Sequence, residues 1–233
     1  MTLIYQYPPL QPGILLKRYK RFFADVELTD GRVVTAHCPN TGPMTCISTP
    51  QSLVQVSHSE DPKRKLAYTW EMIQVNKIWV GVNTAMPNRV IKLALQQKLL
   101  PLGEYQHVQA EVRYGQDSRV DFCLTGGHKP TYVEVKSTTL AEPPLAMFPD
   151  TETTRGQKHL RELTALLPQA RAVMLYFINR EDCHVFAPGD AHDPEYGRLL
   201  RLAIVQGLEV LPCRFAVTPT GISYLGIADI QIT

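Results

Sequence analysis

The first third of the chain consists of short apolar runs separated by turn residues. Asp30-Gly31 is a hairpin signal, and a cluster rich in proline and glycine follows at 39–43. Strands are predicted at 13–28, as two runs around a basic turn, and at 32–37, 52–57, 68–75 and 77–82. Short strands at this spacing indicate a small barrel or sandwich, which we expect to occupy residues 1–84.

The pattern changes after Thr84, where apolar residues recur at helical spacing. Pro87 suits the first turn of a helix predicted over 87–99. Strands are then predicted at 108–114, 119–124, 131–136, 172–178 and 208–215, with helices at 153–166 and 195–206 and a closing hairpin. This order predicts an α/β domain over residues 85–233, so the whole chain has the fold class α/β (α+β).

Composition places the chain among ordinary globular proteins. It is 44% hydrophobic and 20% charged, and its net charge of +2 is too small to indicate nucleic-acid binding unless the cations cluster locally. The five cysteines lack metal-site spacing, which argues against a zinc site or a disulfide framework. No signal peptide or apolar membrane-spanning run is present, so we expect a cytoplasmic protein without a membrane partner.

Three charged residues on neighbouring strands form the strongest chemical pattern. Glu134 and Lys136 differ by two, so their side chains leave the same face of a strand. A turn at Gly126-Gly127 makes the preceding strand antiparallel, which brings Asp121 across from them. Paired carboxylates suit Mg²⁺ or Mn²⁺, and Lys136 would orient the attacking water. Glu111 is a candidate third metal ligand, or else an ordinary exposed strand residue.

Basic residues gather at three places that suit phosphate contacts. The first is the turn before Phe22, where they alternate with aromatic residues, the second is a loop in the barrel, and the third is the start of the 153–166 helix. The alternative interpretation of each cluster is an ordinary solvated surface. The same alternative applies to Glu134-Val135-Lys136 when it is taken alone. The candidate nucleic-acid-binding residues are Lys17, Arg18, Lys20, Arg21, Lys63, Arg64, Lys65, Arg155 and Lys158.

The order of Glu111, Asp121, Glu134-Val135-Lys136 and Gln157 resembles the PD-(D/E)xK nuclease superfamily. Four further stretches, at 18–22, 37–42, 132–137 and 155–160, resemble the sugar fermentation stimulation protein (SfsA) family along nearly the whole chain. The resemblance implies an N-terminal OB-like barrel, a restriction-endonuclease-like domain, DNA binding linked to sugar metabolism, and support of the metal site by Gln157.

Two positions depart from the superfamily pattern, and others are ambiguous. Val120 replaces the expected proline, and Arg161 stands where some relatives carry tyrosine. Asp150 is expected to cap the following helix, and the alternative is that it enters the site. The residues at 37–42 are turn-like by chemistry, although the resemblance suggests a functional surface.

Three functions remain to be distinguished. The first is a DNA-binding protein with a metal-dependent nuclease-type site that hydrolyses phosphodiesters, with catalytic residues Asp121, Glu134, Lys136, Glu111 and Gln157 and metal ligands Asp121, Glu134 and Glu111. The second is a DNA-binding transcriptional regulator of sugar (maltose) metabolism that does not cleave. The third is a protein that binds RNA or nucleotides. A homodimer would suit a DNA-binding protein, but no sequence feature specifies one.

Overall fold

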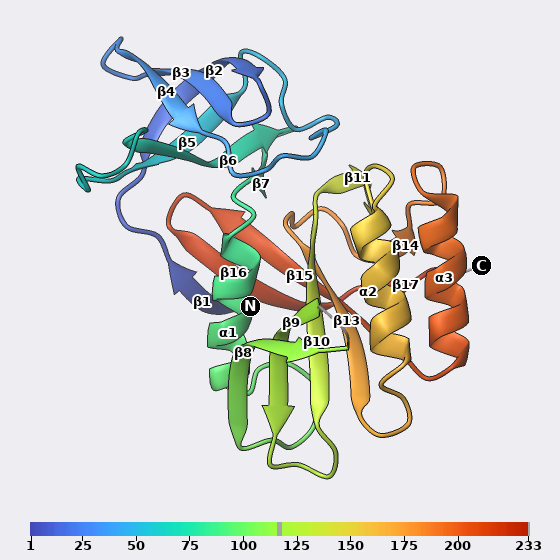
Figure 1. The fold of residues 1–233 in the computed structure, drawn as a ribbon. Coiled ribbons are helices and arrows are strands. Elements are labelled where there is room, and N and C mark those ends of the chain that lie inside the picture. Colours follow the sequence, from blue (N-terminus) through green and yellow to red (C-terminus); the bar gives the residue numbers. More distant parts are fainter. Residues whose placement is uncertain (116–117, 233) are drawn as a thin grey trace.

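The computed structural model describes residues 1–115 and 118–232 of the chain. It contains a small β-barrel and a larger α/β part built on a seven-stranded sheet, which Figure 1 shows one above the other. In the described residues no helix is both long and apolar enough to cross a membrane.

The barrel is closed by five strands: β2 (Gln11–Tyr19), β3 (Phe23–Leu28), β4 (Val33–His37), β5 (Leu53–His58) and β6 (Tyr68–Val75). Strands β2, β3 and β4 form an antiparallel meander, β4 pairs parallel with β6, and β5 pairs with both β6 and β2. This is the connectivity of an OB fold. Alternate residues such as Leu15, Val26 and Val54 fill the interior around the fully buried Trp70.

The larger sheet has the order β1-β16-β15-β13-β10-β9-β8. Its strands are β1 (Thr2–Gln6), β8 (His107–Tyr114), β9 (Ser118–Thr125), β10 (Thr131–Thr138), β13 (Arg171–Ile178), β15 (Glu209–Thr218) and β16 (Gly221–Ile227). Helix α1 (Met86–Gln96) packs on one face, and α2 (Thr154–Thr164) and α3 (Pro194–Val205) pack on the other. A small second sheet joins β11 (Leu140–Glu142), β12 (Leu145–Phe148), β14 (Val185–Pro188) and β17 (Asp229–Ile230).

The central strand β13 explains why the sheet is covered on both faces. Its residues from Ala172 to Ile178 are all buried, and it pairs parallel with β10 and β15. A continuous apolar run is what a parallel strand needs when helices cover both sides. The strand beside it, β10, carries Glu134 and Lys136, so these charged residues lie in the interior of the sheet rather than at its edge.

The N-terminal segment lies outside the barrel to which the sequence assigned it. Strand β1 pairs antiparallel with β16 and therefore belongs to the seven-stranded sheet, whereas the barrel begins with β2. The barrel was expected over residues 1–84, but nothing in the local pattern of 2–6 reveals which distant strand it joins. The short strand β7 (Ile78–Gly81) leads from the barrel to the sheet, and the Gly81 amide donates to the Asn179 carbonyl at 3.1 Å.

Helices α2 and α3 both begin with a capping side chain, but the cap of α2 is not the residue that was expected. The Thr153 hydroxyl accepts from the Gly156 amide and caps α2, so Asp150 is not the cap that was expected. Asp150 lies half-buried three residues earlier, where burial raises the pKa of its carboxyl. Helix α3 begins with Asp193 as its cap and Pro194 in the first turn.

Candidate active site

Two carboxylates meet where β9 and β10 lie side by side. Asp121 is half-buried on β9, and both of its carboxylate oxygens accept hydrogen bonds. Oδ2 accepts from the Val135 amide at 2.7 Å, and Oδ1 accepts from the Asn88 side chain on α1 at 2.6 Å. The strand pairing thus holds the Asp121 carboxylate against the backbone amide of Val135, between Glu134 and Lys136, as the spacing predicted.

Glu134 is almost fully buried and has two different oxygens. Its Oε1 accepts from Lys136 Nζ at 2.8 Å and forms a short hydrogen bond with His159 Nδ1. Lys136 Nζ also lies 3.1 Å from His159 Nδ1, so the three side chains form a closed cluster. The other oxygen, Oε2, is buried without a hydrogen-bond partner among the described residues.

The electrostatics separate the two carboxyls. Burial raises the pKa of Asp121, and the negative charge of Glu134 raises it further. Burial acts on Glu134 in the same direction, but the hydrogen bond from His159 and the charge of Lys136 outweigh it and lower the pKa of Glu134. Glu134 is therefore stably ionised. The ionised form of Asp121 is less favourable, so a positive charge placed beside it would stabilise that form.

These donors fit a hard divalent cation. The unpartnered Oε2 of Glu134 is an anionic oxygen in a buried place, and Asp121 is a second carboxylate whose charge is disfavoured. Mg²⁺ typically takes only one or two protein carboxylates and completes its shell with water and phosphate oxygens. Among the described residues, no group of three or more His, Cys, Asp or Glu side chains is arranged to hold a metal by itself.

Tyr114 adds a further polar group beside this cluster. Its hydroxyl is buried without a hydrogen-bond partner in the described part of the chain. Burial raises the pKa of Tyr114, and the charge of Glu134 raises it further, so the phenol stays protonated and can donate a hydrogen bond. Two unpartnered polar atoms, on Tyr114 and Glu134, are thus present in one region.

The structure shows no hydrogen bond or ion pair that links Glu111 to the cluster of Asp121 and Glu134. It lies on β8 between residues that pair with β9, but its backbone is left-handed, with a φ of 56°. Its side chain is exposed and makes no hydrogen bond or ion pair with another described residue. Its role as a metal ligand stays a prediction.

Gln157 makes a different contact from the one that the resemblance implied. It is buried, and its Nε2 donates to both carboxylate oxygens of Asp193, at 3.0 and 3.1 Å. Asp193 also accepts from the Tyr196 amide as the cap of α3. Gln157 therefore joins α2 to the start of α3 and makes no hydrogen bond to Asp121, Glu134 or Lys136. Its support of a metal site stays a prediction.

His159 and Asn88 are members of the site that the carboxylate pattern did not include. The sequence placed His159 only among the possible phosphate contacts at the start of the 153–166 helix, and it did not indicate Asn88. His159 stands two residues after Gln157, and at helical spacing it faces β10 in place of Gln157. A signal for it existed, because a buried histidine opposite a Glu-x-Lys strand suits a carboxylate partner. Asn88 gave no signal, because only tertiary packing brings α1 to Asp121.

Among the expected nucleic-acid contacts, Arg18 makes several hydrogen bonds within the protein, and its contact with nucleic acid stays a prediction. Its guanidinium donates to the backbone carbonyls of Asn40 at 3.0 Å and Gly42 at 2.9 Å, and to two more distant ones. It therefore holds the 40–43 loop against β2, which is a structural role.

The remaining basic residues lie at the surface. Lys20 and Arg21 form the exposed β2–β3 turn, and 63–65 form the exposed β5–β6 loop. Lys17 is 66% exposed beside Asp25, and Lys158 is 51% exposed beside Glu162. On α2, Arg155 Nε lies 3.4 Å from His159 Nε2, which places one cation at the edge of the carboxylate cluster.

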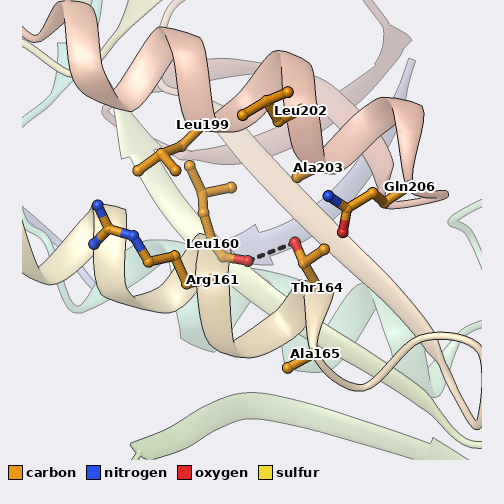
Figure 2. Close-up of a pocket in the computed structure, with 8 residues that line it drawn as sticks. All are labelled: Leu160, Arg161, Thr164, Ala165, Leu199, Leu202, Ala203 and Gln206. Carbon is orange, nitrogen blue, oxygen red and sulfur yellow. Dashed lines mark hydrogen bonds between the residues drawn. The ribbon is translucent and has the colours of Figure 1, made fainter.

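A separate hollow lies between α2 and α3 and is shown in Figure 2. Its volume is about 290 Å³, and leucine and alanine side chains from both helices form much of its wall. Arg161, the residue at the position of the superfamily tyrosine, lines it and pairs with Glu195 at 3.2 Å. No carboxylate lines this hollow, so it is not where the chemistry of the Asp121 and Glu134 pair takes place.

Comparisons with known proteins agree with both parts of the fold. A family model described as the sugar fermentation stimulation protein RE domain matches residues 85–221, and one described as the SfsA N-terminal OB domain matches residues 16–82. A sugar fermentation stimulation protein homolog of Nostoc punctiforme is 67% identical over 240 residues, with full coverage of both chains. One of Trichormus variabilis is 68% identical over 237 residues, which cover 98% of each chain.

A solved structure extends the comparison. It is described as Pyrococcus furiosus SfsA in complex with Ca²⁺ and is similar to this chain with a TM-score of 0.91. The two sequences are 26% identical, and the match covers 100% of each chain. The similarity therefore includes both the barrel and the seven-stranded sheet.

Proposed function

This chain belongs to the sugar fermentation stimulation protein family, and we propose that it binds DNA and hydrolyses a phosphodiester bond with a divalent metal ion. The observation that carries the proposal is the pair Asp121 and Glu134, with an unpartnered carboxylate oxygen and Lys136 beside it. A relative solved in complex with Ca²⁺ supports the choice of a divalent ion.

In this proposal each residue of the site has a defined task. Asp121 and Glu134 would hold Mg²⁺ or Mn²⁺, and Glu111 is a candidate to join them from β8. A bound ion would supply positive charge that stabilises the transition state at the scissile phosphate and makes a water more acidic. Lys136, as a cation fixed on Glu134, would donate hydrogen bonds that orient the water and the phosphate.

His159 and Asn88 would act as positioning residues. His159 holds Oε1 of Glu134 on the side of Lys136, which leaves Oε2 for another partner. Asn88 holds one oxygen of Asp121 in place. The exposed cations of the barrel and of the start of α2 would bind the phosphates on either side of the cleaved bond.

Cleavage assays on purified protein test this proposal. With Mg²⁺ or Mn²⁺ the wild-type chain should cut DNA, and Asp121→Ala and Lys136→Ala should lose the activity. Titration calorimetry with Mn²⁺ alone should show binding to the wild type and none to Asp121→Ala. Cleavage that persists in both variants would come from a contaminating nuclease or another site and would sink the proposal.

A second candidate is DNA binding without cleavage, as expected of a transcriptional regulator. One observation favours it, because Lys136 already pairs with the charge of Glu134, and His159 forms a hydrogen bond with the same oxygen, without a metal. Such a protein should bind a defined duplex better than random competitor DNA, with steep salt dependence and no cleavage under any metal. Competition between matched RNA and DNA oligonucleotides would separate both candidates from an RNA-binding function.

A further inference from the structure

One face of the barrel carries a hollow that is separate from the carboxylate site. Its volume is about 490 Å³, within the range of roughly 300–1,000 Å³ that is usual for small-ligand sites. We call it the barrel pocket, and it is lined by Phe22, Phe23, His37, Arg64, Lys65 and Leu66. These residues come from the β2–β3 turn, from β3 and β4, and from the β5–β6 loop.

The floor of the barrel pocket is aromatic. Phe23 pairs with His37 across β3 and β4, and its ring stacks on Tyr19 with centroids 5.4 Å apart. Phe22 stands beside them and is 48% exposed. The preceding turn residues Lys20 and Arg21 have φ values of 49° and 64°, and this left-handed turn leads into Phe22.

The rim of the barrel pocket is positive. Arg64 donates to the Thr69 hydroxyl at 2.7 Å, which fixes its guanidinium beside β6, and no carboxylate is among the lining residues. Lys65 is exposed and has no ion pair among the described residues. The nearby Asp25 is already engaged by Tyr19, Thr35 and Lys17. The lining residues therefore carry positive charge that attracts an anionic ligand.

We propose that the barrel pocket binds an unpaired nucleobase of single-stranded DNA. The base would stack on the exposed Phe22 ring and its aromatic neighbours, and the flanking phosphates would contact Arg64 and Lys65. In the interior of a duplex each base face is already covered by its neighbours, so stacking on a protein ring favours an unpaired base. The proposal rests on the proposed function only in its choice of DNA as the nucleic acid.

The proposal names the class of substrate for the carboxylate site. DNA with an unpaired segment, such as an overhang or a gap, would engage the barrel pocket through its single strand. A fully paired duplex would contact only the cations. The chain should therefore prefer DNA that contains single-stranded nucleotides over a blunt duplex of the same length.

Binding assays on the full chain test this, with Asp121→Ala as the parent so that cleavage does not interfere. Fluorescence anisotropy would compare a labelled oligothymidine with a blunt hairpin of equal charge. Phe22→Ala should weaken oligothymidine binding by about 5–150-fold, the loss expected for one stacked base, and weaken hairpin binding much less. Phe22→Trp should retain the binding.

Leu53→Ala is the matched control. Leu53 is 49% exposed on the same barrel, almost equal to Phe22, and it pairs with Ile14 in the first half of β2. It should bind like the parent. Equal binding by the Phe22→Ala and Leu53→Ala variants, or an equal loss on the hairpin, would overturn the proposal, and tighter binding of a matched RNA would overturn the choice of DNA.

The two proposals fail separately. If Phe22→Ala loses single-strand binding while the wild-type chain cuts no DNA with Mg²⁺ or Mn²⁺, the barrel pocket stands and hydrolysis fails. If the wild-type chain cuts DNA and Phe22→Ala binds normally, hydrolysis stands and the barrel pocket fails.

Discussion

The carboxylate site and the barrel pocket hold their charges in opposite ways. At the site, the side chains of Glu134 and Lys136 are 4% and 12% exposed and each contacts His159. At the barrel, the cations are at the surface, and Lys65 has no ion pair in the described part of the chain. The first arrangement fixes geometry, and the second leaves charge available to a ligand.

The difference follows from what each task requires. Groups that stabilise a transition state must be in place before the reaction, in a site where water does not weaken their electric field. Phosphate binding tolerates mobile cations, and salt screens exposed charges over about 10 Å at 0.1 M. Substitutions at the site should therefore change rate and stability, whereas those at the barrel should change affinity and its salt dependence.

The largest expected effect is that of Lys136→Met on cleavage. Loss of a group that orients water and phosphate typically lowers the rate by about 10²–10⁴-fold. DNA affinity should change little, because Lys136 is a single, mostly buried cation. Single-turnover cleavage and anisotropy measure the two quantities, with Lys92→Met on the exposed side of α1 as the control. A parallel loss of affinity would show that Lys136 mainly binds DNA.

The next effect concerns stability. His159→Ala removes the hydrogen bond between His159 and buried Glu134. The loss of one partner by a buried polar group typically lowers the free energy of unfolding by about 1–3 kcal/mol. Urea unfolding measures it, with the half-exposed Lys158→Ala on the same helix as the control. Combining His159→Ala with Glu134→Gln should cost less than the sum of the two single changes, because both remove one interaction. Strict additivity would contradict the contact.

A smaller effect is expected for Lys65→Gln on the barrel. Each lost phosphate contact should reduce the slope of log affinity against log salt by about 1. The protein's stability and its cleavage rate at saturating DNA should stay the same. Lys77→Gln, at the exposed β6–β7 turn of the same barrel, removes an equal charge and is the control. An equal change in slope for both variants would show that the barrel attracts DNA only through its total charge.

The sequence revealed more of the fold than of the site. The barrel strands, the order of the α/β elements and the neighbouring positions of Asp121, Glu134 and Lys136 follow from short-range patterns, because alternation and turn residues act locally. The pairing of β1 with β16 has no local signature. For the same reason the segment 2–6 could not be assigned to the sheet.

Contacts between elements limited the prediction of the site. Sequence order placed Gln157 at the start of α2, but the turn of the helix directs it to Asp193 and directs His159 to Glu134. Arg18 belongs to a basic run, yet the carbonyls of the 40–43 loop surround its guanidinium. In each case the residue type was informative, and its partner depended on tertiary packing.

The smallest expected effect is a pH-dependent gain in stability from Asp121→Asn. Burial and Glu134 raise the folded-state pKa of Asp121 above its ordinary 3.8, so its ionised form is less favourable in the folded than in the unfolded chain. This cost is present at neutral pH, and it is relieved as the pH falls through the folded-state pKa and then the unfolded one. Without metal, the asparagine variant should therefore be more stable than the wild type near pH 7 and lose that advantage in acid. The side-chain amide of Asn88 can turn around, so both hydrogen bonds at this position remain available.

Adding Mg²⁺ or Mn²⁺ should stabilise the wild type and not the Asp121→Asn variant, because only the folded wild type binds the ion. Urea unfolding across pH, with and without metal, measures both trends, and an equal response of the two proteins to the ion would place the cation elsewhere.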